Sequence, residues 1–184
     1  QGDYSKIKAG SKIRKMCIHK SILQERTDQN MFLPWLTGGI AALDLFIKDE
    51  IEREGDEEFP RDLPGTKGFI RIHKSYNPGF PFGFMKERPQ LVKGIPLAVT
   101  SAAAGALAAL FTKKGCVAQK IGLSMVLGGA ISNLYDRLAK GYVVDYFSIE
   151  FKRLKNVIFN LGDIFVFLGS LIFLAAELLE DMKD

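Results

Sequence analysis

Six polar residues in the C-terminal half of the sequence have the types and spacing of a hydrolytic site. They are Asn133, Asp136, Arg137, Asp145, Asn160 and Asp163. All of them lie inside or beside long apolar runs. An ionisable side chain in or next to a membrane span is costly, and by default it marks function. The set therefore predicts a chemical site within a membrane protein.

Asp145 and Asp163 are the strongest candidates for catalysis. Asp145 lies in a β-prone run, residues 141–147, and Asp163 lies near the start of the last apolar run. Two carboxyl groups held close together cannot easily both ionise, so at neutral pH they share one proton. The ionised carboxylate can accept a proton from water while the protonated one polarises an amide carbonyl. This is aspartic-protease chemistry, and it requires neither a metal nor another cofactor.

Helical spacing predicts how the other polar residues are oriented. Asn133, Asp136 and Arg137 are related by three and four positions, so they share one helix face. Asn160 and Asp163 share a face of the last helix for the same reason. Asp136 is an alternative candidate for the catalytic pair of aspartates, but the adjacent Arg137 offers Asp136 a structural role. The alternative interpretation is that all six residues form a polar packing network between helices.

Four apolar runs are predicted to cross a membrane and to position these residues. They cover residues 31–47, 94–111, 121–135 and 157–176. A span needs about 20 predominantly apolar residues, and the Ala, Gly, Ser and Thr of the second run allow close helix packing. The alternative for the first run is a buried helix of a soluble protein.

The long hydrophilic section 48–93 follows the first run and begins with a predicted ion pair. Lys48 lies four positions after Asp44, so on a helix it can neutralise that carboxylate. The acidic run 49–58 is interpreted as a solvated face or a mobile loop. Residues 68–73 then alternate apolar and polar side chains, which predicts a half-exposed strand.

The distribution of lysine and arginine predicts a topology. These residues concentrate beside the apolar runs, and both termini and the 112–120 turn are predicted to be cytoplasmic. Residues 48–93 and 136–156 are then extracytoplasmic, although 136–156 also carries positive charge. Residues 1–30 are polar and basic, without the apolar region of a secretory signal, and are predicted to be a cytoplasmic extension.

Composition argues against several other classes of protein. The net charge is +4 and the pI is about 9.0, but no basic stripe is interleaved with aromatic residues, so no nucleic-acid partner is expected. Cys17 and Cys116 are far apart, and no CxxC or Cys/His cluster occurs. We therefore expect two unpaired thiols and no metal site.

Three blocks of the sequence resemble, in order and at near-usual spacing, those of signal peptidase II. They are residues 128–137 (GGAISNLYDR), 141–146 (GYVVDY) and 159–163 (FNLGD). The resemblance implies a membrane aspartic endopeptidase of the cell membrane that cleaves prolipoproteins before the diacylglyceryl-modified cysteine. It also implies an all-α membrane bundle with four transmembrane helices plus a small extracytoplasmic β-sheet cradle.

The same resemblance implies roles for individual residues. Asp145 and Asp163 match the two catalytic acids of the family. Asn133, Arg137 and Asn160 match positions that line its site.

Weaker matches extend the resemblance over residues 31–176. Residues 77–83 (NPGFPFG) resemble a family block in which Phe80 and Pro81 replace two alanines, and Asn77 is its candidate substrate-orienting residue. The polar residues with implied structural roles are Asp44, Lys48 and Asp136.

The combined prediction is a four-helix membrane peptidase domain, residues 31–184, preceded by the 1–30 extension. It is expected to act as a monomer on a diacylglyceryl-modified prolipoprotein whose lipid tail lies in the membrane between helices. The rival is a non-catalytic membrane protein of the same fold. Such a protein would bind lipopeptides or, as a transporter, would use the two aspartates as proton carriers. A transporter would more often show repeat symmetry between its halves, and this sequence shows none.

Overall fold

The computed structural model describes residues 31–80, 84–152 and 154–182. Residues Leu36–Asp184 form one compact unit, and the chain up to Trp35 forms another, of which residues 31–35 are described. The predicted extension 1–30 lies outside the described residues.

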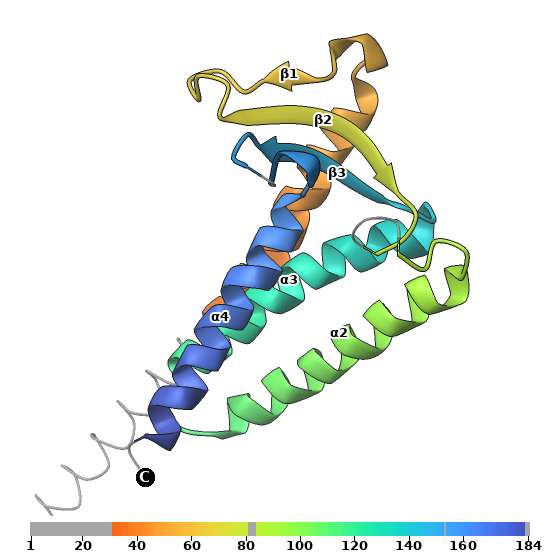
Figure 1. The fold of residues 1–184 in the computed structure, drawn as a ribbon. Helices are drawn as coiled ribbons and strands as arrows, with labels where there is room; N and C mark the ends of the chain where they lie inside the picture. The colour runs from red at the N-terminus through yellow and green to blue at the C-terminus, as the bar shows by residue number, and fades with distance from the viewer. Residues whose placement is uncertain (1–30, 81–83, 153, 183–184) are drawn as a thin grey trace, which may run out of the picture. The chain divides into compact units, whose positions relative to one another are not determined.

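The described residues contain four long helices. Their bounds are Met31–Arg53, α2 Pro89–Thr112, α3 Val117–Ala139 and α4 Leu161–Asp181. α3 packs against both α2 and α4 (Figure 1). Close backbone approach makes this packing possible, because a Cβ added at Gly129 would lie 2.1 Å from the carbonyl oxygen of Gly162. α3 is therefore the central helix of the bundle.

Three of these helices are long and apolar enough to cross a membrane: Met31–Arg53, α2 and α4. α3 is not among them, so the prediction of four spans is supported here for three. The physical reason is that α3 buries polar side chains, including Gln119, Lys120 and Asp136, which lower its mean hydropathy. Its length matches that of the other three.

The first and last helices differ from their predicted bounds. The first continues to Arg53, so the start of the acidic run 49–58 is helical, and Asp56–Glu58 form a short 3-10 helix. Glu52 pairs with Lys140, which corrects the interpretation of the whole run as a solvated face or a loop.

The last helix begins at Leu161, not at 157, because the side chain of Asn160 caps it. Asn160 therefore lies just before the helix and not on the helix face where it was predicted to lie.

A three-stranded antiparallel sheet lies at one end of the helices (Figure 1). Its strands are β1 Arg61–Asp62, β2 Ile70–Asn77 and β3 Val143–Ile149, in the order β1-β2-β3. The two predicted β-prone segments correspond to β2 and β3, each displaced toward the C-terminus. In the register of β2 with β3, Ser75 lies opposite Asp145, and the pairing is irregular between Ile72 and Ser75.

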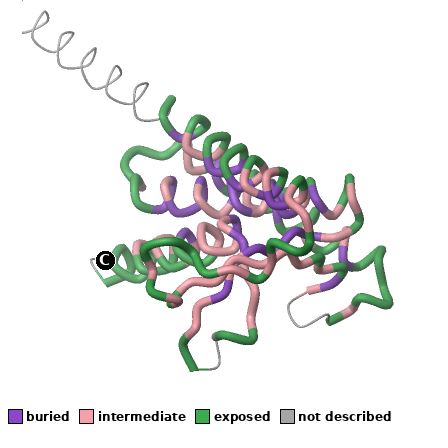
Figure 2. The backbone as a smooth tube through the Cα atoms, turned by 90° about the horizontal axis from the view of Figure 1, so that it is seen from above, coloured by how far each residue is buried: buried purple, intermediate pink, exposed green. Residues whose placement is uncertain are grey.

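β3 joins the sheet to the helices because its two faces differ. Val144 and Tyr146 are buried with Ile51 of the first helix in a small apolar cluster. Side chains alternate along a strand, so Asp145 and Phe147 point to the opposite face. Figure 2 shows the buried segments gathered where the helices pack together. The strand thus presents Asp145 on a rigid support.

Candidate active site

Asp145 and Asp163 are held by amide donors at the junction of β3 and α4. Asp145 accepts hydrogen bonds from Nδ2 of Asn160 at 2.8 Å and from Nδ2 of Asn77 at 3.2 Å. Asp163 accepts them from Nδ2 of Asn133 at 2.8 Å and from the backbone N–H of Asn160 at 3.3 Å. Each carboxylate therefore has two donors that fix its position.

Asn160 connects the two carboxyl-bearing elements through one side chain. Its Nδ2 donates to Asp145 on β3, and its Oδ1 accepts from the backbone N–H of Asp163 at 2.9 Å. Asp163 in turn accepts from the backbone of Asn160, which completes a capping box at the start of α4. The start of the helix and the geometry of the two carboxyl groups are thus set by the same residue.

Substitution of Asn160 is expected to separate its two roles. Asn160→Asp keeps an acceptor for the helix cap but replaces the donor to Asp145 with a second anion. We expect the predicted hydrolysis to be about 10- to 100-fold slower, as for loss of a hydrogen bond to a charged group, with helix stability retained. Asn160→Ala should also lower the free energy of unfolding by about 0.5–2 kcal/mol through the lost cap. The rate of hydrolysis and thermal unfolding in detergent measure the two effects, and a parent-like rate for Asn160→Asp would contradict the bridging role.

Both carboxyl groups face one cavity of about 590 Å³. It is lined by Asn77, Arg137, Val143, Asp145, Val157, Ile158, Phe159, Asp163, Val166, Phe167 and Ser170. Apart from Asn77, Arg137, Ser170 and the two aspartates, its lining residues are apolar. The cavity can therefore hold a largely apolar ligand that has one polar reacting group.

Arg137 places a cation beside the aspartates in this cavity. Its guanidinium donates to the carbonyl oxygens of Asn133 and Gly79, at 3.3 and 3.5 Å, and lies 5.9 Å from the ring centroid of Phe80. Its Nε is buried and has no hydrogen-bond partner among the described residues. A buried donor of this kind has capacity for a ligand carbonyl.

The pKa of Asp145 is raised to about 6, chiefly because the carboxyl group is buried and also because the charge of Asp163 lies nearby. Hydrogen bonds from Asn77 and Asn160 partly oppose this shift. Asp145 therefore keeps its proton up to about pH 6, well above the range of an exposed aspartate. The protonated carboxyl group is the form that can donate a hydrogen bond to a substrate carbonyl.

This raised pKa predicts that stability depends on pH. The pKa of Asp145 is about 6 in the folded protein, against 3.8 for an ordinary aspartate, so between these values the folded state binds more protons than the unfolded state. The free energy of unfolding therefore falls as the pH rises from about 4 to about 6. About 3 kcal/mol is the upper order of magnitude for this loss. Asp145→Asn should flatten that part of the profile, whereas Asp62→Asn, on the exposed edge of the sheet, should not. Unfolding in detergent between pH 4 and 8 tests this, and equal slopes for the parent and Asp145→Asn would refute it.

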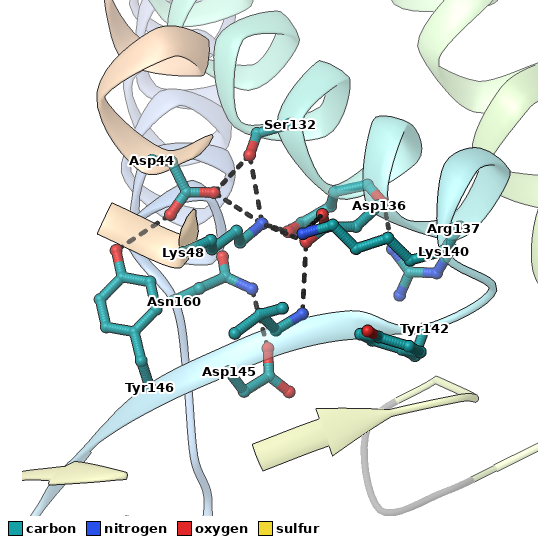
Figure 3. A network of polar contacts seen from close by, with 12 residues as sticks. Asp44, Lys48, Ser132, Asp136, Arg137, Lys140, Tyr142, Asp145, Tyr146 and Asn160 are labelled. Carbon is teal, nitrogen blue, oxygen red and sulfur yellow. Dashed lines mark hydrogen bonds and ion pairs between the residues drawn. The ribbon is translucent and has the colours of Figure 1, made fainter. Parts of the chain in front are cut away.

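A second, fully buried polar network lies behind the aspartates (Figure 3). Nζ of Lys48 lies 2.7 Å from Asp44 and 3.2 Å from Asp136, so the ion pair predicted from the i,i+4 spacing is present. The same ammonium group donates to Ser132 at 3.1 Å and to Oδ1 of Asn133 at 2.7 Å. Because Lys48 occupies the amide oxygen of Asn133, the amide nitrogen is directed to Asp163.

Asp136 has partners other than the one predicted for it. It pairs with Lys48 and, at 2.9 Å, with Lys140, and it accepts from the backbone N–H of Val144 at 3.2 Å. It forms no ion pair with Arg137 in the described structure, because adjacent helix residues project in different directions. The contacts of Asp136 thus connect α3 to β3 and to the first helix.

Two residues of the network were not identified from the sequence. Ser132 donates to Asp44, and the Tyr146 hydroxyl donates to Asp44 at 3.0 Å while accepting from the backbone N–H of Leu161 at 2.9 Å. Burial raises the pKa of Tyr146, so it stays a neutral donor. Strand alternation places Tyr146 on the face opposite Asp145, but no local pattern in the sequence pairs Tyr146 with Asp44 of the first helix.

The described residues contain no group of three or more His, Cys, Asp or Glu side chains placed to hold a metal ion. Cys116 is a free thiol, and Cys17 lies outside the described residues. The polar side chains that line the cavity carry carboxyl, amide, guanidinium and hydroxyl groups.

Comparison with known proteins gives a consistent result. The family model described as Signal peptidase (SPase) II matches residues 36–179. The lipoprotein signal peptidase of Aeromonas hydrophila is 33% identical over 144 residues, which cover 75% of this chain and 84% of that relative. The lipoprotein signal peptidase of Desulfitobacterium hafniense is 31% identical over 153 residues, which cover 83% of this chain and 97% of that relative. A bacterial membrane enzyme solved by the in meso method at 2.3 Å resolution has a similar fold, with a TM-score of 0.65, 21% identity, and coverage of 82% of this chain and 89% of that one.

Proposed function

The chain belongs to the signal peptidase II family, and we propose that Asp145 and Asp163 are the catalytic pair of its reaction. The activity is removal of the signal peptide from prolipoproteins at the cell membrane. The observation that carries the proposal is that carboxyl groups from β3 and α4 face one cavity, each held by amide donors. In this proposal the enzyme is an aspartic endopeptidase.

The surroundings of the two carboxyl groups assign them different roles. Asp163 is the third residue of α4, at the positive end of the helix dipole, and it accepts a hydrogen bond from Asn133. In this proposal Asp163 is the carboxylate that accepts the proton of the attacking water. Asp145, buried and with a raised pKa, carries the shared proton and donates it to the carbonyl oxygen of the scissile bond. Binding of an apolar substrate expels water from the cavity, which favours the protonated form of Asp145 further.

The amide and guanidinium groups around the pair orient the peptide. Asn77, Asn133 and Asn160 hold the carboxyl groups through hydrogen bonds, and Asn77 also lines the cavity. Arg137 has a buried Nε donor that can bind a substrate carbonyl. Asp44, Lys48 and Asp136 do not line the cavity, and their part is structural.

α3 is the fourth membrane-crossing helix in this proposal. It packs between α2 and α4, has the length of a span, and faces its polar residues into the bundle. With four crossings, the two connections that contain strands, 54–88 and 140–160, lie on the same side. That side is extracytoplasmic, both termini are cytoplasmic, and residues 31–184 form the peptidase domain.

The substrate is a prolipoprotein cleaved before its diacylglyceryl-modified cysteine, by a monomeric enzyme. The apolar walls of the cavity, from Val157 to Phe159 and on α4, suit a substrate that approaches from the membrane. The carboxyl pair lies at the start of α4, beside the sheet, where water also reaches it.

The test is a cleavage assay with the purified protein in lipid nanodiscs. The substrate is a prolipoprotein peptide with a dipalmitoylglyceryl cysteine, and mass spectrometry identifies the products. We expect cleavage before the modified cysteine, no cleavage of the peptide with a free cysteine, and full activity with a metal chelator present. Tight binding without cleavage would support the non-catalytic rival, and equal cleavage of both peptides would refute the proposed substrate.

A further inference from the structure

One end of the sheet carries exposed aromatic and cationic side chains. Phe69 comes just before β2 and Phe151 just after β3, and they are 51% and 50% exposed. The backbone N–H of Glu150 donates to the carbonyl oxygen of Phe69 at 2.9 Å, so the connection 63–69 lies beside the residues that follow β3. We define the sheet tip by six exposed side chains of these two segments: Leu63, Lys67, Phe69, Phe151, Lys152 and Lys155.

The sheet tip lies beside the first turns of a helix that can span the membrane. Ile149, the last residue of β3, lines one apolar cavity together with Ile164 and Leu168 of α4. These two residues lie about 5 and 11 Å along the helix from its first residue, Leu161. β3 therefore ends at a level inside the apolar stretch of α4, and Phe151 follows two residues later. The tip is thus placed where lipid headgroups meet the apolar layer.

The positive charge of the sheet tip has no partner within the described structure. It comes from three exposed lysines: Lys67, Lys152 and Lys155. None of them forms an ion pair with another described residue, and Nζ of Lys152 lies 5.2 Å from the ring centroid of Phe151. The neighbouring carboxylate, Glu150, accepts a hydrogen bond from the buried hydroxyl of Ser148 at 3.2 Å. The ammonium groups are therefore available to an external anion.

We propose that the sheet tip binds the headgroups of anionic phospholipids, with its aromatic rings at the edge of the apolar layer. Aromatic and leucine side chains are favoured at that boundary. Lysine stems lie along apolar surface while their ammonium groups reach the phosphates, and each lysine near an anionic surface favours the contact about fivefold. Lipid fits this surface better than a protein partner, because the tip continues into the exposed apolar face of α4, where Leu168 is 43% exposed.

This contact explains a charge pattern that membrane topology leaves unexplained. The connection 140–160 carries lysine and arginine although it is placed on the extracytoplasmic side, where they are usually fewer. Lysines that bind headgroups have a role on that side. Because Asp145 lies on the same strand as the tip, the contact also holds its carboxyl group at a fixed height above the bilayer.

Fluorescence quenching tests where the sheet tip lies. Trp35 is the single tryptophan of the sequence, so Trp35→Phe provides a background for Phe69→Trp or, independently, Phe151→Trp as reporter. Glu58→Trp, in the exposed 3-10 helix that follows the first helix, is the matched control. The nanodiscs contain phosphatidylcholine brominated near the top of its acyl chains. We expect loss of emission from both tip reporters and none from the control.

A second experiment tests selection of anionic lipid. The Phe151→Trp reporter is placed in equimolar phosphatidylglycerol and phosphatidylcholine, with bromine on one lipid or on the other. We expect phosphatidylglycerol to be enriched about fivefold or more beside the reporter, and less so at high salt. Changing the three tip lysines to glutamine should abolish the enrichment. Lys113→Gln with Lys114→Gln, in the turn between α2 and α3 at the other end of the bundle (Figure 1), should leave it unchanged.

Each other outcome overturns the proposal in a recognisable way. Unquenched tip reporters place the tip in water, where an acidic protein segment is the better partner. Equal quenching by both brominated lipids shows apolar contact without selection of anionic headgroups. Enrichment that survives loss of the three lysines assigns it to other groups. None of these measurements uses cleavage, so they are independent of the roles proposed for Asp145 and Asp163.

Discussion

Replacing either Asp145 or Asp163 with asparagine is expected to slow cleavage by about 10²–10⁴-fold, the usual contribution of a positioned acid or base. Asparagine preserves size and polarity, so the backbone and the cavity should not change. Without Asp163 no carboxylate accepts the proton of the attacking water. Without Asp145 no acid donates to the carbonyl oxygen. Because the two act as one unit, the double variant should be about as slow as either single one.

Stability separates loss of chemistry from loss of fold in these variants. Asp145→Asn removes a buried carboxyl group with a raised pKa, so above pH 6 its free energy of unfolding should equal or exceed that of the parent. Asp181→Asn, on the exposed last turn of α4, is the matched control and should cleave like the parent. The kinetics use the dipalmitoylglyceryl peptide in nanodiscs. Parent-like cleavage by either single variant would exclude that residue from the catalytic pair.

Lys48→Met is expected to be the most destabilising single substitution of the charged residues. Its ammonium group and its partners Asp44 and Asp136 are fully buried. Removing one partner of a buried ion pair leaves uncompensated charge and costs about 3–5 kcal/mol. The amide of Asn133 also loses the donor that orients it toward Asp163, so the folded fraction should cleave more slowly.

Charge balance provides an internal test of this explanation. Lys48→Met combined with Asp44→Asn leaves Asp136 paired with Lys140, and should recover much of the lost stability. Lys86→Met, on an exposed residue, is the control and should change unfolding little. Unfolding in detergent and cleavage at low temperature measure the two effects. If Lys48→Met unfolds like the parent, the network does not stabilise the bundle.

Several features of the fold and the site follow from residue type and spacing. Apolar runs identified the helices, because a span in lipid requires apolar side chains. Period-two alternation identified a segment that overlaps β2, and the β-prone run 141–147 overlaps β3. The Asp44–Lys48 pair follows from helix geometry alone, since residues four apart are neighbours. Asp145 and Asp163 were candidates because ionisable side chains beside a membrane span are costly and usually mark function.

Other features depend on how separate elements pack, and no local pattern encodes them. The start of α4 depends on the capping box of Asn160 and Asp163, and a continuous apolar run conceals that boundary. Asp136 pairs with Lys48 of the first helix and not with its neighbour Arg137, because the bundle brings those helices together.

The sequence by itself determined that two aspartates border apolar helices and can share a proton, because residue type and hydropathy are local properties. Only the tertiary structure decided that Asn160 connects them, that Lys48 orients Asn133 toward Asp163, and that an apolar cavity begins at the carboxylate. These contacts join residues up to 85 positions apart. Their geometry arises when the sheet and the helices pack, which is the step that turns two costly charges into one site.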